Sequence, residues 1–258
     1  MTMLDQLVAA AKRRVEQDKA RMPVFKDAPL QRPGEFPFEE ALRKEGISFI
    51  CEVKKASPSK GMIAEHFPYV EIARDYEGAG ADAISVLTEP DFFLGADRYL
   101  REIRKAVKLP LLRKDFIIDP YQIEQSRYLG ADAVLLIVAI LTPAQLRRYI
   151  GMATDLGLSC LVEAHDETEL QIALDAGARI IGVNNRNLKT FTVDVQNSIR
   201  LKGFAPKETV FVAESGIQSA EDITMLREHS INAVLVGETL MRAADKAAAL
   251  KSLRGEAP

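Results

Sequence analysis

The sequence predicts an α/β protein built as a single (β/α)₈ TIM barrel with an N-terminal helical extension. The length of 258 residues fits one such barrel, which typically needs about 250 residues. Eight short β-prone runs recur at intervals of roughly 20 to 35 residues, and each is followed by a segment with helical periodicity. Most runs are continuously apolar, which is typical of parallel strands buried on both faces.

The expected strands and the signals between them can be placed along the chain. Helix starts are marked by Asp119-Pro120 and Thr142-Pro143, a cap residue followed by proline, and Ser219 with Asp222 resembles a capping box. Glycines before later strands, Gly80, Gly130 and Gly177, are expected to end helices. The eight expected strands are residues 48–53, 83–87, 111–113, 133–138, 160–162, 180–183, 210–212 and 233–236.

Residues 1–47 are predicted to form a helical extension that packs on a barrel of residues 48–258. An apolar stripe through Leu4 and Leu7 predicts an amphipathic helix, and residues 29–37 read as a proline-containing linker. The run Lys12-Arg13-Arg14 is interpreted as a solvated helix face. The alternative fold is a doubly wound open sheet, but residues 54–61 after the first strand do not form the glycine-rich loop that such a sheet normally carries.

Composition limits the classes of function. The formal net charge is −3, with 34 basic and 37 acidic residues interspersed, so no nucleic-acid footprint is indicated. No apolar run near the start is long enough for a signal peptide or membrane span, and we expect a cytoplasmic protein with no membrane partner. Cys51 and Cys160 are interpreted as reduced core thiols, because a zinc site or disulfide framework needs more ligands at closer spacing. No metal site is expected.

Polar residues concentrate where the expected strands end, the end at which barrels of this kind carry their active sites. Glu and Lys are almost never fully buried unless paired, so several of them converging on one barrel mouth indicate an enzyme site. The alternative is a ring of surface ion pairs, which has more weight for Glu89 and Asp115. The strand-end residues are Glu52, Lys54, Thr88, Glu89, Lys114, Asp115, Glu163, Asn184, Arg186, Glu214, Ser215, Gly237 and Glu238.

The loops after the last two strands predict a phosphate site. Residues 213–216 and 236–239 occupy the positions where barrels recurrently bind phosphate through backbone N–H groups and a short helix N-terminus. Gly216 and Gly237 would let the backbone approach the anion closely. The histidines show no metal-ligand spacing, and solvent-facing roles are preferred for His66, His165 and His229.

Several segments together resemble the indole-3-glycerol phosphate synthase family over residues 38 to 250. The matching segments are 52–59, 85–89 with Phe92-Phe93, 112–116, 135–137, 161–163, 182–188, 212–217 and 236–238. The resemblance implies ring closure of 1-(2-carboxyphenylamino)-1-deoxyribulose 5-phosphate to indole-3-glycerol phosphate, with release of CO₂ and water. It implies no metal and no organic cofactor.

The same resemblance implies roles for particular residues. Lys114 would be the acid at ring closure, unless it only pairs with Asp115, and Lys54 would bind the substrate carboxylate or act as acid in dehydration. Glu52 would be the base for dehydration, and Glu163 would orient Lys114. Two ammonium groups in one cleft are expected to lower each other's pKa. The implied positioning groups are Asn184, Arg186 and Glu214.

The resemblance also assigns the two ends of the substrate. The phosphate side maps to Ser57, Ser215, Gly216, Gly237 and Glu238, and Glu238 is expected to present only its backbone N–H to the anion. The apolar wall for the aryl ring maps to Phe93, Phe116, Leu135, Leu188 and Leu235, which plain core roles would explain nearly as well. Two rival functions remain open at this point. One is a Schiff-base aldolase, and the other is a sugar-phosphate-binding regulator that has lost its activity.

Overall fold

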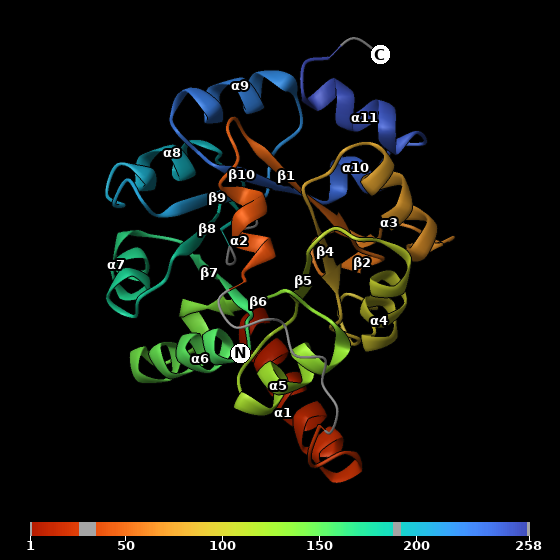
Figure 1. Cartoon of the computed structure of the whole chain (residues 1–258), viewed down its shortest axis with the longest axis vertical. Coiled ribbons are helices and arrows are strands. Elements are labelled where there is room, and N and C mark those ends of the chain that lie inside the picture. Colours follow the sequence, from red (N-terminus) through yellow and green to blue (C-terminus); the bar gives the residue numbers. More distant parts are fainter. Residues whose placement is uncertain (1, 26–34, 188–191, 257–258) are drawn as a thin grey trace.

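The computed structural model describes residues 2–25, 35–187 and 192–256, and shows a closed ring of eight parallel strands (Figure 1). Consecutive strands pair around the ring, and the first pairs with the last, so no edge remains. Each strand lies within two residues of its expected bounds. The strands are β1 (Ser48–Val53), β4 (Ala83–Leu87), β5 (Leu111–Lys114), β6 (Ala133–Ile137), β7 (Ser159–Ala164), β8 (Ile180–Asn184), β9 (Val210–Glu214) and β10 (Ala233–Val236).

Helices follow the strands and cover the outside of the ring (Figure 1). The expected caps are confirmed: the side chains of Asp119, Thr142 and Ser219 each accept a backbone N–H in the first turn of their helices. Gly130 ends its helix with a φ of 90°, a conformation that favours glycine. The helices are α3 (Tyr69–Gly78), α4 (Asp97–Ala106), α5 (Pro120–Leu129), α6 (Pro143–Asp155), α7 (Glu167–Asp175), α8 (Gln196–Lys202), α9 (Ala220–Glu228), α10 (Glu238–Arg242) and α11 (Lys246–Leu253).

Two short irregular pieces complete the strand ends. After β1 the chain forms a small antiparallel hairpin of β2 (Ala56–Ser57) and β3 (Gly61–Met62). After β6, Val138 does not extend the strand as expected but opens a 3₁₀ turn, η1 (Val138–Ile140). Both pieces lie at the carboxyl end of the ring, where the loops are shaped for the cavity described below.

The N-terminal extension contains two helices, α1 (Met3–Arg21) and α2 (Pro37–Leu42). Figure 1 shows α2 lying across the ring of strands. Phe38 and Leu42 are fully buried in the same apolar cluster as residues at the strand starts, such as Ala83 and Val210. The helix α2 therefore closes the amino-terminal end of the barrel. The first part of the expected 29–37 linker, residues 29–34, lies outside the described residues.

The helix α1 packs against α5 and is held there by ion pairs. Lys12 and Arg13 are exposed, as expected. The expectation is wrong for Arg14, whose guanidinium lies 2.5 Å from the carboxylate of the buried Asp115. Lys19 also pairs with Asp119 at the start of α5, at 2.8 Å. A charge run marks a helix surface but does not identify the one member that has a buried partner far along the chain.

Polar side chains also join neighbouring strands at the amino-terminal end of the ring. Asp82, just before β4, accepts the N–H of Phe49 in β1, and Asp132, just before β6, accepts the N–H of Leu111 in β5. Asn232, just before β10, does the same for Phe211 in β9. The repeated motif of a polar residue before a strand therefore fixes the register of adjacent strands at the end of the barrel away from the cavity.

Candidate active site

A cavity of about 650 Å³ opens at the carboxyl ends of the strands. It is lined by strand-end residues from around the ring, by the loops that follow them and by the first turns of α1. Of the candidate site residues, Leu188 lies outside the described residues, and Thr88 and Glu89 do not line the cavity. Those that line it are Glu52, Lys54, Ser57, Phe93, Lys114, Asp115, Phe116, Leu135, Glu163, Asn184, Arg186, Glu214, Ser215, Gly216, Leu235, Gly237 and Glu238.

Lys114, the last residue of β5, lies between two buried carboxylates. Its Nζ is 2.7 Å from Oε2 of Glu214 and 3.7 Å from Oε2 of Glu163. The expected alternative, an ion pair with Asp115, is not formed, because Asp115 follows Lys114 and points to the opposite side of the strand. Here the "Lys114 cluster" means Glu52, Lys54, Lys114, Glu163 and Glu214.

Electrostatics in the Lys114 cluster differ from the sequence-based expectation. Burial alone would lower the pKa of Lys114, but Glu214, Glu163 and Glu52 outweigh it and raise the pKa above its ordinary value. The expected lowering is therefore wrong for Lys114, whose pKa is governed by the three carboxylates. Lys114 is a fully charged ammonium at neutral pH.

The two carboxylates beside Lys114 are not equivalent. Burial raises the pKa of Glu214, and the charges of Glu163 and Glu52 add to this, so that its pKa lies above the ordinary value despite Lys114. Glu163 is equally buried, but contact with His165 and the charge of Lys114 overcome the burial and lower its pKa to about 2. Glu163 is therefore the firmly ionised member of the pair, and Glu214 accepts a proton more readily.

Glu52, in β1, and Lys54, just after β1, are two residues apart and therefore point to the same side, where they form a second ion pair. Lys54 Nζ lies 2.6 Å from Glu52 Oε1, and both side chains are largely buried. A Cβ at Gly237 would lie 2.6 Å from the same Glu52 oxygen. The absence of a side chain at Gly237 therefore leaves room for this ion pair. A Cβ at Gly182 would similarly lie 2.1 Å from Oε1 of Glu214.

Asn184, at the end of β8, connects the carboxylates to the loops. Its Nδ2 donates to Oε1 of Glu163 at 3.4 Å, while its Oδ1 accepts the hydroxyl of Ser215 at 2.9 Å and the backbone N–H of Arg186 at 3.0 Å. One amide side chain therefore sets the positions of a carboxylate, a hydroxyl and the loop that carries a guanidinium.

The loops after β9 and β10 form the opposite end of the cavity. Ser215 and Gly216 both have positive φ, 69° and 86°, which is uncommon for serine and typical of strained functional sites. Ser57 from β2 and the basic side chains of Lys60 and Arg242 line the same end. The carboxylate of Glu238 is 3.0 Å from Arg242 Nε and 3.5 Å from Lys60 Nζ, so that it is turned toward cations.

Apolar residues form the remaining wall of the cavity. The rings of Phe93 and Phe116 lie 6.1 Å apart, and Leu135 and Leu235 contribute from the barrel interior. The loop that carries Phe93 is held by Glu89, whose carboxylate accepts three consecutive backbone N–H groups, including that of Phe93. Sequence reasoning missed the apolar side chains that α1 contributes, Met3, Leu4 and Leu7, although the predicted stripe of α1 was the available signal.

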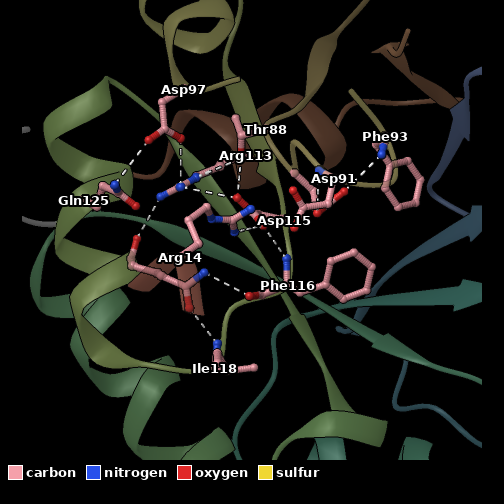
Figure 2. A network of polar contacts seen from close by, with 12 residues as sticks. Arg14, Thr88, Asp91, Phe93, Asp97, Arg113, Asp115, Phe116, Ile118 and Gln125 are labelled. Carbon is pink, nitrogen blue, oxygen red and sulfur yellow. Dashed lines mark hydrogen bonds and ion pairs between the residues drawn. The ribbon is translucent and has the colours of Figure 1, made fainter. Parts of the chain in front are cut away.

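A second charged group lies on the other side of the β5 end. In this "Asp115 cluster", Asp115 accepts hydrogen bonds from Arg14, Thr88, Arg113 and the N–H of Phe116 (Figure 2). Arg113 also donates to Asp97, to Ser126 and to the carbonyl of Gln122. Burial would raise the pKa of Asp115, but Arg14 and Arg113 outweigh it and lower the pKa. The cluster joins α1, β5 and α5, and Asp115 is the charged member of it that reaches the cavity wall.

Like Arg14, His165 does not have the solvent-facing role that the sequence predicted. It follows β7, and its ring lies between Glu163 and Glu169. Among the described residues, no group of three or more His, Cys, Asp or Glu side chains is placed to hold a metal ion. In that same part of the chain no helix has the length and apolar character needed to cross a bilayer.

Comparisons with known proteins add independent information. A family model described as indole-3-glycerol phosphate synthase matches residues 4–253. A protein of that name from Ruminiclostridium cellulolyticum is 55% identical, over 99% of this chain and 100% of its own length. Another, from Endomicrobium trichonymphae, is 54% identical over 98% and 99%. A 3-hexulose-6-phosphate synthase structure from Salmonella typhimurium has a TM-score of 0.66 at 15% identity, covering 81% of this chain and 97% of that one, which supports the fold alone.

Proposed function

Because the chain belongs to the indole-3-glycerol phosphate synthase family, we propose that the Lys114 cluster performs the family's ring closure with separate roles for its charged groups. The reaction converts 1-(2-carboxyphenylamino)-1-deoxyribulose 5-phosphate to indole-3-glycerol phosphate, with loss of CO₂ and water. The chain is thus a carboxy-lyase of tryptophan biosynthesis that acts on a phosphorylated small molecule. Membership of this family decides against the Schiff-base aldolase and the inactive regulator.

Lys114 is assigned as the acid at ring closure. When the aryl carbon that bears the carboxylate attacks the ketone, negative charge develops on the ketone oxygen, and an ammonium group can donate a proton to it. An alkoxide is a much stronger base than an amine, so this transfer is favourable even though the pKa of Lys114 is raised. The assignment depends on one observation: Nζ lies in the cavity wall and is kept charged by Glu163 and Glu214.

The remaining charged groups suit the later steps. Glu163, which is firmly ionised, is placed to stabilise the cationic character of the intermediate that forms before CO₂ leaves. Dehydration then needs an acid on the departing hydroxyl and a base for the released proton. Lys54 and Glu52, 2.6 Å apart in one pair, are assigned as that acid and base. Glu214 positions Lys114.

The two ends of the cavity are assigned to the two ends of the substrate. The phosphate is assigned to the loops after β9 and β10 with Ser57, through Ser215, Gly216, Gly237 and the backbone of Glu238. Arg186 suits the substrate carboxylate because its forked guanidinium binds carboxylates in a bidentate manner, and Asn184 positions its loop. The aryl ring is assigned to the apolar wall of Phe93, Phe116, Leu135 and Leu235.

The test is turnover of the carboxyphenylamino substrate, followed by the fluorescence of the indole product. We expect Lys114→Ala to lose roughly 10²-fold or more in kcat, the usual scale for losing a general acid, with inhibition by inorganic phosphate nearly unchanged. Lys105→Ala, at an exposed position of α4 outside the cavity, is the matched control and should behave as the parent. Near-normal turnover by Lys114→Ala would remove Lys114 from its role.

We also propose that this reaction takes place in the cytoplasm and that nucleic acid is not a partner. Two free thiols, Cys51 and Cys160, and the slightly negative net charge support this. Fractionation of cells that express the chain, with the product-forming activity as the marker, tests the location.

A further inference from the structure

We propose that His165 is a positioning residue for the reaction: its imidazolium, held by Glu169 at the start of α7, fixes the carboxylate of Glu163 beside Lys114. This inference goes beyond the roles assigned above, and it depends on them only in that Glu163 must act in the cavity. His165 itself does not line the cavity.

The ring of His165 lies between two acceptors. Its Nδ1 is hydrogen-bonded to Oε2 of Glu169 at 2.8 Å, whereas its Nε2 lies 3.3 Å from Oε1 of Glu163, within ion-pair range but not aligned for a hydrogen bond. An ionised carboxylate only accepts hydrogen bonds, and a neutral imidazole carries a single N–H. A neutral ring would therefore direct a lone pair at one of the two carboxylates. The imidazolium, with an N–H on both nitrogens, suits both neighbours.

The surroundings of His165 leave it little freedom to move away. Its backbone N–H donates to the same Glu169 oxygen at 2.9 Å, and its carbonyl accepts from Asn197 of α8 at 3.1 Å. Glu169 is in turn fixed at the third position of α7, where its own N–H donates to the cap residue Asp166. The side chain of His165 is 17% exposed. The start of α7 therefore holds the ring in place from outside the barrel.

Charge balance explains what the imidazolium contributes. Glu163 and Glu214 share one ammonium group, Lys114, which is closer to Glu214 by about an ångström, 2.7 against 3.7 Å. His165 gives Glu163 a second cationic neighbour, which Glu163 shares with Glu169. Burial lowers the pKa of His165, but Glu163 and Glu169 outweigh it and raise the pKa to about 10, so the ring is charged at neutral pH. Within the described ranges Glu214 has an ion pair with Lys114 and none with a second cation, and its pKa is raised.

The contacts of Glu163 also determine which of its two oxygens faces Lys114. With Oε1 of Glu163 directed to His165 and to the amide of Asn184, its other oxygen, Oε2, is the one that faces Lys114. Without the imidazolium, rotation of the carboxylate and uptake of a proton both become easier, and each would weaken the charge that Glu163 offers a cationic intermediate.

The first experiment compares His165→Gln with the parent. Glutamine keeps a donor at this position but removes the charge. We expect kcat to fall about tenfold, on the general scale of a lost charged contact near reacting groups, while KM and inhibition by inorganic phosphate stay within about twofold. The acidic limb of the kcat profile should move to higher pH, because Glu163 loses the cation that keeps it ionised. Glu169→Gln, which retains the ring but loosens it, should give a smaller change in the same direction.

Histidine NMR provides a readout that a purely packing role would not affect. The chain has only three histidines, so in a His66→Gln, His229→Gln background every ring signal belongs to His165. The nitrogen shifts of an imidazolium should persist at pH 8. Titration near pH 6.5, the ordinary histidine value, would overturn the proposal.

The outcomes separate this inference from the function it extends. His229→Gln alone, at an exposed position outside the cavity, is the matched control and should retain normal turnover. If Lys114→Ala is inactive but His165→Gln has the kcat and pH profile of the parent, only the His165 proposal fails. If Lys114→Ala stays active, the assigned function fails first. A His165→Gln protein that merely unfolds at lower temperature, with an unchanged pH profile, also counts against the proposal.

Discussion

Lys114 and Asp115 are consecutive residues, yet they belong to charged clusters of opposite character. Asp115, on the outer side of β5, has its oxygens bonded to two guanidinium groups, a hydroxyl and a backbone N–H. Lys114, on the inner side, faces three carboxylates, and Oε1 of Glu214 has no hydrogen-bond partner in the described part of the chain. The Asp115 cluster, whose hydrogen bonds are satisfied, joins structural elements. The Lys114 cluster keeps a carboxylate oxygen available to accept a hydrogen bond from a substrate.

The pKa directions follow the same division. In the Asp115 cluster the guanidinium groups overcome burial, and the pKa of Asp115 falls. In the Lys114 cluster one carboxylate has a lowered pKa and its neighbour a raised one. Pairs of buried groups whose proton affinities are pushed apart are typical of sites that exchange protons. Buried charge alone does not distinguish a structural cluster from a catalytic one, but the balance of partners does.

The largest expected effect comes from breaking the Asp115 cluster. Asp115→Ala leaves Arg14 and Arg113 without their shared carboxylate, and we expect the free energy of unfolding to fall by about 3–5 kcal/mol. Urea denaturation measures this change. The kcat of the folded fraction should fall less than that of Lys114→Ala. A stable Asp115→Ala protein with a kcat as low as that of Lys114→Ala would reverse the roles assigned to the two clusters.

A smaller effect, on activity instead of stability, is expected from Glu214→Gln. The amide still accepts from Lys114, but the charge that holds the ammonium in place is gone, so kcat should fall about tenfold, or about 1.4 kcal/mol in activation free energy. Because the folded protein disfavours the ionised form of Glu214, the neutral variant should be as stable as the parent or more stable at pH 7. Thermal denaturation checks this. Clear destabilisation would mean that Glu214 is a structural residue after all.

The most gradual effect concerns alkaline pH. The pKa of His165 is about 10 in the folded protein, above the ordinary 6.5 that applies to the unfolded chain. Its stabilising contribution is therefore complete below pH 6.5 and is lost as the pH rises toward 10. The difference in free energy of unfolding between the parent and His165→Gln should narrow over this range. A difference that is constant from pH 6 to 10 would show that charge is not what His165 contributes.

Much of this site could be predicted from the sequence because strand ends in a barrel meet at one rim. Continuous apolar runs located β1 and β7, and the next charged residue in each, such as Glu52 or Glu163, could then be placed at the cavity. The roles of Arg14 and His165 could not be predicted in this way. Arg14 depends on the distant Asp115, and His165 depends on how two carboxylates are oriented. Hydrophobic periodicity reveals neither.

The pKa of Lys114 could not be predicted for a related reason. Two ammonium groups in one cleft predict mutual repulsion, but a sequence gives no distances. The result is decided by three carboxylates near Nζ, one of them at 2.7 Å. Similarly, the apolar stripe of α1 indicated that the helix packs on the barrel, but not that Leu4 and Leu7 reach the cavity.

The attachment of α1 has a consequence for the order of events during synthesis. Arg14 and its partner Asp115 are 101 residues apart, and Lys19 is 100 residues from Asp119. When α1 leaves the ribosome, the segment that it will pack against has not yet been synthesised. Its apolar side chains therefore have nothing to pack against until β5 and α5 emerge. Contacts so distant along the chain form slowly, because a long loop must close first. The wall of the cavity nearest the N-terminus is thus translated first and assembled late.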